Sequence, residues 1–131
     1  MGWLVNTLVG LSVSVGFGMP NRLSTVPLPP PEPTIEEKIL AELPPVFIKI
    51  AKAESRLKPN AYNPEWHYDS DGKKLCQGSF GLLQLSCEHL LENPEALYDV
   101  DMNIQLAKKI YEENGFEAWG VCTDGKVKCY E

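Results

Sequence analysis

The sequence predicts a mainly α-helical domain of the α+β class with one small β or loop region. An apolar segment and a proline-rich linker precede it. Three observations predict this: apolar residues recur at helical spacing within residues 35–131, turn-forming residues dominate 58–79, and prolines crowd 23–34. The chain has 131 residues, of which 44% are hydrophobic, enough for one small domain with its own core.

Residues 1–22 predict a signal peptide or a short signal-anchor. No charged side chain precedes Arg22, and the apolar stretch is close to the shortest length that spans a membrane. The stretch also lacks a basic start and an obvious cleavage site, so the sequence leaves open whether it is removed. If it is retained, residues 1–21 would anchor the protein in a membrane. Residues 23–34 form the proline-rich linker, which we expect to be an extended spacer.

Two helices are predicted at the start of the domain. Thr34 and Glu37 have the spacing of a capping box, which opens a helix that runs through Leu43. The pair Pro44-Pro45 ends this helix, and the second proline suits the first position of the next one, over residues 46–57.

The central segment combines turns with a further apolar run. Residues 58–79 predict a loop or short hairpin, with "DSDGKK" as its turn. The run "FGLLQLSCEHLLEN", residues 80–93, predicts a return to helix that ends before Pro94.

A long helix and a tight hairpin are predicted to complete the domain. Asp99 or Asp101 caps the helix and Gly115 ends it. Its predicted buried face consists of Ile104, Ala107, Ile110 and Tyr111. The tail "VCTDGKVKCYE" predicts a hairpin around Asp124-Gly125.

Charge and cysteine content exclude several classes of function. A net charge of −6 argues against a nucleic-acid binder, which needs a basic face. The four cysteines form no C-x-x-C pair and have no paired histidines, so we expect no zinc, and we expect no other cofactor. They favour disulfides in an oxidising compartment over the alternative of buried thiols in a cytosolic protein.

Glu54 is the first candidate functional residue. It shares one helical stripe with Phe47, Ile50 and Leu57, a position where an apolar side chain would pack. Partial desolvation there should raise its pKa, and a carboxylic acid protonated near neutral pH can protonate a leaving glycosidic oxygen. The alternative is a side chain that reaches solvent or pairs with Arg56 or Lys58.

Five short motifs in a fixed order give Glu54 a context. The motifs are Glu54-Ser55, Pro59-Asn60-Ala61, Gly78-Ser79-Phe80-Gly81-Leu82-Leu83-Gln84, Asn103-Ile104 and Ala118-Trp119. Together they resemble the soluble lytic transglycosylases and goose-type lysozymes, over about residues 36–120. The resemblance implies a lysozyme-like fold and an enzyme that cleaves the bond between N-acetylmuramic acid and N-acetylglucosamine in peptidoglycan.

The resemblance also implies roles for individual residues. Glu54 aligns with the general acid/base of lytic transglycosylases, which close an anhydro-muramic ring with help from the substrate's N-acetyl group. Gln84 and Ser79 would line the sugar groove, and Asn63 would orient the N-acetyl group. Ser55 follows the catalytic residue as in the family, although its hydroxyl could instead bond its own helix. The flexible backbone of Gly78 and Gly81 would let the chain pass close to the sugar.

Aromatic residues supply further candidates for sugar binding. Trp119 stands where many family members have a tyrosine, and its ring could stack on a sugar. Tyr62, Trp66 and Tyr68 could do the same, or could simply cover a small core. His67 and His89 have no visible partners and are expected to be ordinary surface or groove residues.

Two rival functions stay open. Hydrolysis by a lysozyme-type route needs a second group to place water, and Asp69 or Asp71 are the candidates in the long loop. The second rival is a lysozyme-like module that binds glycan without cleaving it. The absent family tyrosine and the short sequence after Trp119 motivate this alternative. In each case the expected partner is a peptidoglycan strand, outside the cytoplasm, bound by a monomer.

Four cysteines allow three complete pairings, and the sequence does not select one. We favour Cys76–Cys87, which brackets "QGSFGLLQLS", and Cys122–Cys129, which closes the tail. The first pair would hold the motif loop against the segment that follows it.

Overall fold

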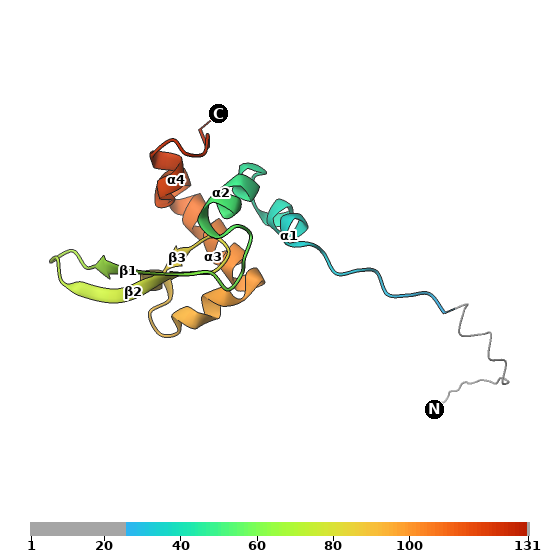
Figure 1. Ribbon diagram of the computed structural model, residues 1–131, viewed down its shortest axis with the longest axis horizontal. Helices are drawn as coiled ribbons and strands as arrows, with labels where there is room; N and C mark the ends of the chain where they lie inside the picture. The colour runs from blue at the N-terminus through green and yellow to red at the C-terminus, as the bar shows by residue number, and fades with distance from the viewer. Residues whose placement is uncertain (1–25, 131) are drawn as a thin grey trace, which may run out of the picture. The chain divides into compact units, whose positions relative to one another are not determined.

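The computed structural model describes residues 26–130, whose compact unit starts at Pro33 (Figure 1). The predicted signal segment 1–22, the first residues of the linker and Glu131 lie outside the described residues. Residues 26–34 are exposed and form no helix or strand. No helix in the described part has both the length and the apolar character needed to cross a membrane.

The compact unit is a mixed α+β domain, with three α-helices of eight or more residues and a three-stranded antiparallel sheet. Helix α1 (Ile35–Glu42) starts with the predicted capping box: Glu37 N donates to Thr34 Oγ1 (3.1 Å), and Thr34 N donates to Glu37 Oε1 (2.8 Å). Helix α2 (Val46–Ser55) follows Pro45 as predicted. It ends two residues early, because Arg56 and Leu57 both adopt positive φ, 58° and 61°.

Of the two forms expected for residues 58–79, a loop or a short hairpin, the chain forms the hairpin. Strands β1 (Tyr62–Tyr68) and β2 (Lys74–Phe80) pair antiparallel, and the short β3 (Leu85–Ser86) adds to β2. Asp69 fixes the turn, because its Oδ1 accepts hydrogen bonds from the backbone N–H groups of Asp71 and Lys73, both at 2.9 Å. Figure 1 shows this hairpin extending away from the helices.

The helix predicted over residues 80–93 is wrong. The chain instead forms a tight turn at 81–84, strand β3 and a short 3₁₀ helix (Cys87–Leu90), followed by a second 3₁₀ helix (Pro94–Tyr98). Gly81 and Gln84 have φ of 79° and 50°, which no α-helix contains. The apolar residues of this run are buried by the surrounding elements, so their pattern did not require a helix.

The last long helix is confirmed, but the tail hairpin is wrong. Helix α3 (Val100–Asn114) is capped by Asp99, whose Oδ2 accepts from Met102 N (2.9 Å), and it stops at Gly115. A 3₁₀ turn (Gly115–Ala118) and the helical turn α4 (Gly120–Thr123) follow. The backbone N–H of Asp124 donates a hydrogen bond to the carbonyl oxygen of Gly120 at 2.8 Å. Backbone groups that are engaged in such helical hydrogen bonds cannot also pair two strands of a hairpin.

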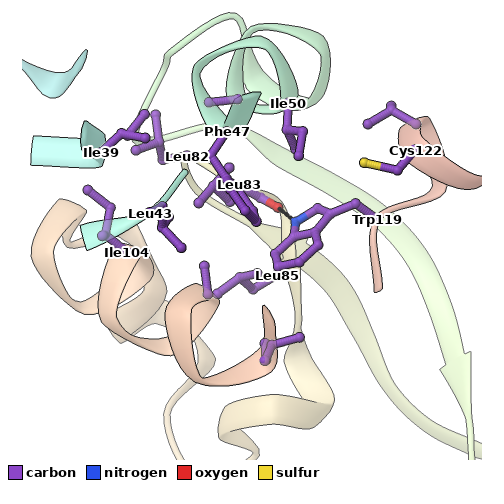
Figure 2. Packing of buried hydrophobic residues seen from close by; sticks show 14 of the residues in the cluster. Ile39, Leu43, Phe47, Ile50, Leu82, Leu83, Leu85, Ile104, Trp119 and Cys122 are labelled. Atoms are coloured by element: carbon purple, nitrogen blue, oxygen red, sulfur yellow. Dashed lines mark hydrogen bonds between the residues drawn. The ribbon is translucent and has the colours of Figure 1, made fainter. Parts of the chain in front are cut away.

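The core lies where the three helices meet the turn at 81–84 (Figure 2). Phe47, Leu82 and Leu83 are fully buried at its centre. The ring of Trp119 packs edge-on against Phe47, with 4.9 Å between ring centroids. On α3, Ile104, Ala107 and Ile110 are buried as predicted, while Tyr111 is half-buried.

Candidate active site

A cleft of about 840 Å³ opens beside the C-terminal end of α2. Its walls come from α2, the β1–β2 hairpin, the segment 84–89, the end of α3 and the region that follows α3. Most of the lining side chains are polar or charged: Glu54, Asn63, Glu65, His67, Ser79, Gln84, Ser86, Glu88, His89, Asn114, Glu117, Asp124 and Lys126. The volume is within the range of small-molecule binding sites.

Glu54 lies in this cleft, half-buried, at the next-to-last position of α2. Desolvation is the largest of the causes that raise the pKa of its carboxyl to about 7, and the negative charge of Glu65 is the next. The positive charge of Lys126 opposes this shift, and the smaller effect of Asp124 adds to it. The negative end of the α2 dipole also disfavours an ionised carboxylate at this position. Glu54 can therefore be protonated near neutral pH, as its place on the apolar stripe predicted.

The pairing of Glu54 with Arg56 or Lys58 is not found. Among residues 26–130, the salt bridges are Lys38–Asp101, His67–Glu65 and Lys108–Glu42, and none involves Glu54. Arg56 is left-handed and exposed at the end of α2. Glu54 thus faces the cleft as an unpaired acid.

Glu65 is the most consequential of the cleft residues that the sequence reasoning missed, because its charge acts on Glu54. Its Oε1 accepts a hydrogen bond from Ser79 Oγ at 3.4 Å, and His67 Nε2 lies 3.3 Å from the same hydroxyl. Alternate residues of β1, namely Asn63, Glu65 and His67, all line the cleft. A bulge between Asn63 and Trp66 interrupts the regular pairing of β1 with β2, so the sequence carried no local signal that would have placed Glu65 in the cleft.

Asp69 and Asp71, the carboxylates expected to place water in a hydrolase, do not line the cleft. They lie at the far end of the hairpin, where Asp69 is engaged in the turn. The expectation fails because the long loop is a regular hairpin, which carries its tip away from the cleft. Glu65 is the carboxylate of this hairpin that shares the cleft with Glu54.

Four of the predicted sugar-binding residues line the cleft: Asn63, Ser79, Gln84 and Trp119. Asn63 is exposed, whereas Ser79 is 5% exposed. Gln84 is half-buried, and its side-chain Nε2 donates to the backbone oxygens of Ala61 (3.2 Å) and Gly81 (3.0 Å). These bonds fix the side chain of Gln84 on the cleft wall.

Ser55 and Trp119 have structural positions that do not suit sugar binding. The Ser55 hydroxyl is buried, donates to the carbonyls of Ala51 (3.1 Å) and Leu82 (2.7 Å), and accepts from Lys58 N. Trp119 borders the cleft but is only 2% exposed, and its Nε1 donates to the Leu83 carbonyl at 3.1 Å (Figure 2). Both side chains hold the turn at 81–84, so we correct their assignment from substrate contacts to positioning residues.

Asn103 is the third group that holds this turn, and it is fully buried. Its Oδ1 accepts from Leu83 N (3.0 Å), and its Nδ2 donates to the carbonyls of Phe80 (3.0 Å) and Leu97 (2.8 Å). A Cβ at Gly81 would collide with Leu97 O and with the Asn103 amide. Gly81 is therefore required by close packing on Asn103.

The exposed aromatic residues of β1 lie outside the cleft. Tyr62, Trp66 and Tyr68 are 47%, 42% and 55% exposed, and none lines the cleft. Tyr62 packs on Phe80 with 5.1 Å between ring centroids, and Lys74 Nζ lies 4.5 Å from the centre of the Trp66 ring. The described structure therefore gives no support to stacking by these three rings on a sugar inside the cleft.

Both histidines line the cleft, as expected for groove residues. Desolvation lowers the pKa of His89, and the nearby His67 adds to this effect while Glu88 opposes it. Within residues 26–130, no group of three or more His, Cys, Asp or Glu side chains is arranged to hold a metal ion.

Two disulfides form, in the favoured pairing. Cys76–Cys87 joins β2 to the 3₁₀ helix that carries Glu88 and His89, so it ties two cleft walls together. Cys122–Cys129 closes the tail after α4. Two disulfides in a small domain indicate an oxidising, extracytoplasmic setting.

Comparison of the chain with protein-family models, with curated proteins and with solved structures finds no match.

Proposed function

We propose that this protein is a peptidoglycan lytic transglycosylase with a lysozyme-like fold and Glu54 as its single general acid/base. The observation that carries the proposal is a carboxyl with a pKa of about 7 in a cleft of about 840 Å³ lined by polar side chains. A general acid/base works best when its pKa is close to the working pH, because both protonation states are then populated.

The proposed reaction uses Glu54 twice. The protonated carboxyl first donates its proton to the glycosidic oxygen, and the C1–O bond of N-acetylmuramic acid breaks. The substrate's N-acetyl carbonyl stabilises the cationic C1. The C6 hydroxyl of the same sugar then attacks C1, and the Glu54 carboxylate takes up its proton. The product carries an anhydro-muramic end, and Glu54 returns to its initial protonated state.

The motif residues support this proposal by their arrangement around the cleft. Asn63 and Gln84 line it beside Glu54, where they could contact the N-acetyl group and the sugar ring. Asn103, buried beneath the turn, holds the backbone that carries Gln84. The substrate lies outside the cytoplasm, which agrees with the setting that the two disulfides indicate.

Digestion of purified peptidoglycan tests the proposal. The full chain and its Glu54→Gln variant are incubated with the wall polymer, and soluble products are read by mass spectrometry. Anhydro-muramic ends from the wild type and none from the variant are expected. Folded wild-type protein that pellets with the wall but releases nothing would contradict the enzyme and leave a glycan-binding module.

A further inference from the structure

Three cleft side chains form a hydrogen-bonded cluster that the proposed single-glutamate reaction does not use. Ser79 Oγ donates to Glu65 Oε1 at 3.4 Å, and His67 Nε2 lies 3.3 Å from the same hydroxyl. When the ring proton of His67 is on Nε2, the hydroxyl accepts from His67 while it donates to Glu65. The same nitrogen lies 3.8 Å from Glu65 Oε1.

The backbone explains why this cluster forms. Asn63 pairs with Ser79 and Trp66 with Gln77, so β1 has one more residue than β2 between these pairs. Such a bulge redirects the side chains that it contains, and Glu65 lies within it. Ser79 is 5% exposed, which keeps its hydroxyl in one environment. Glu65 is exposed on its cleft side and is accessible to water or substrate.

Glu65 also acts on Glu54 across the cleft. After desolvation, the negative charge of Glu65 is the largest cause of the raised Glu54 pKa. The two carboxyls come from different elements, α2 and β1, and both line the same cleft. Glu54 is an acid that can hold a proton near pH 7, and the negative charge of Glu65 favours the protonated form of Glu54.

We propose that Glu65, held by Ser79 and His67, is a second reacting carboxylate that activates water, so that part of the cleaved glycan ends as reducing sugar. This inference rests on the proposed function, because it begins after Glu54 has protonated the leaving oxygen. Glu65 is a catalytic residue in this scheme, while Ser79 and His67 are positioning residues.

The step balances without any further reactant. A water oxygen forms the new bond to C1 of N-acetylmuramic acid, and the N-acetyl oxygen that stabilised C1 is released. Glu65 takes the proton that the water loses, and this proton returns to solvent. Glu54, which gave its proton to the leaving sugar, is reprotonated from solvent. Ring closure and water attack thus compete for the same activated C1.

The ratio of reducing ends to anhydro-muramic ends measures this competition. Both products share the first step, but the Glu54 carboxylate acts as a base only in ring closure. Removing the charge of Glu65 lowers the pKa of Glu54 and makes it a weaker base for ring closure, so a purely electrostatic role of Glu65 predicts a ratio that rises or stays constant. Loss of the general base should instead lower the ratio, since such bases contribute about 10²–10⁴-fold.

The experiment compares Glu65→Gln, Ser79→Ala and His67→Gln with the wild-type full chain on purified peptidoglycan, with thermal unfolding as a check on folding. Glu88→Gln is the matched control, because it removes a cleft carboxylate outside the cluster. We expect the ratio to fall at least about tenfold in Glu65→Gln. It should fall less in Ser79→Ala and His67→Gln, and should stay constant in Glu88→Gln.

The failures are distinguishable. Only anhydro-muramic ends from the wild type, or an unchanged or higher ratio in Glu65→Gln, would overturn the inference and leave the proposed function intact. A wild type that releases no product would remove the proposed function and this inference with it. Reducing ends alone that disappear in Glu65→Gln would support the role of Glu65 and reject ring closure.

Discussion

Replacing Glu54 by glutamine is expected to stabilise the fold at neutral and alkaline pH. The pKa of Glu54 rises from 4.5 to about 7 on folding, so the folded state binds the proton more tightly than the unfolded state. Stability must then fall as pH rises through this interval, and the full penalty is present above pH 7. Glutamine cannot ionise and is free of this penalty.

The magnitude follows from the pKa change. Each pKa unit corresponds to about 1.4 kcal/mol, which sets a ceiling of about 3 kcal/mol for Glu54. The side chain is only half-buried, and solvent screening reduces this figure. We expect Glu54→Gln to gain about 1–2 kcal/mol at pH 8 and almost nothing at pH 4.

Urea unfolding of both proteins between pH 4 and pH 8, with disulfides intact, measures the difference. Glu42→Gln is the control with the opposite sign, because a hydrogen bond from Lys108 lowers the pKa of Glu42. Glu42→Gln should be less stable than the wild type at pH values above the unfolded-state pKa of Glu42. The difference in stability should shrink as the pH falls below that pKa. A Glu54→Gln difference that stays flat with pH, or a loss at pH 8, would refute a desolvated Glu54.

Three further predictions concern the turn that carries the motif residues and the wall beside it. Gly81→Ala should lower the free energy of unfolding by about 2–3 kcal/mol, because the new Cβ would meet backbone and a buried amide. Gly125→Ala should lower it by about 1 kcal/mol, because that site has open space and only the positive φ of 84° opposes the change. The midpoints of urea unfolding compare the two variants. Asn103→Ala should lose about 3 kcal/mol by leaving buried backbone groups unpaired, seen as a lower melting temperature, and a loss below 1 kcal/mol would contradict its role. Replacing Cys76 and Cys87 together by serine should lower the free energy of unfolding by about 3 kcal/mol, because the disulfide closes a loop over 11 positions. Under reducing conditions the wild type and this variant should be equally stable.

The elements that the sequence predicted correctly are those that short-range interactions specify. The capping box at Thr34 and Glu37, the break at Pro44-Pro45 and the stop at Gly115 each act within a few residues. The hairpin was also predicted, because its turn chemistry is local.

The wrong elements are those whose form depends on distant partners. The run at 80–93 has helical apolar content, but Asn103 and Trp119 hold it as a turn from twenty or more positions away. The tail has the Asp124-Gly125 turn of a hairpin, yet α4 takes up the backbone groups that a ladder would need. Apolar pattern alone does not distinguish these outcomes, since both bury the same side chains.

By itself the sequence indicated an acid with a raised pKa at Glu54, from its place on the apolar stripe of one helix, and left a solvent-exposed or paired side chain open as the alternative. It also indicated the favoured disulfides and four residues of the cleft wall, Asn63, Ser79, Gln84 and Trp119. Only the tertiary structure decided which second carboxylate shares the cleft, since a bulge in β1 orients Glu65 while the hairpin carries Asp69 and Asp71 away. Strand register and long-range packing set these positions, and neither can be read from local spacing.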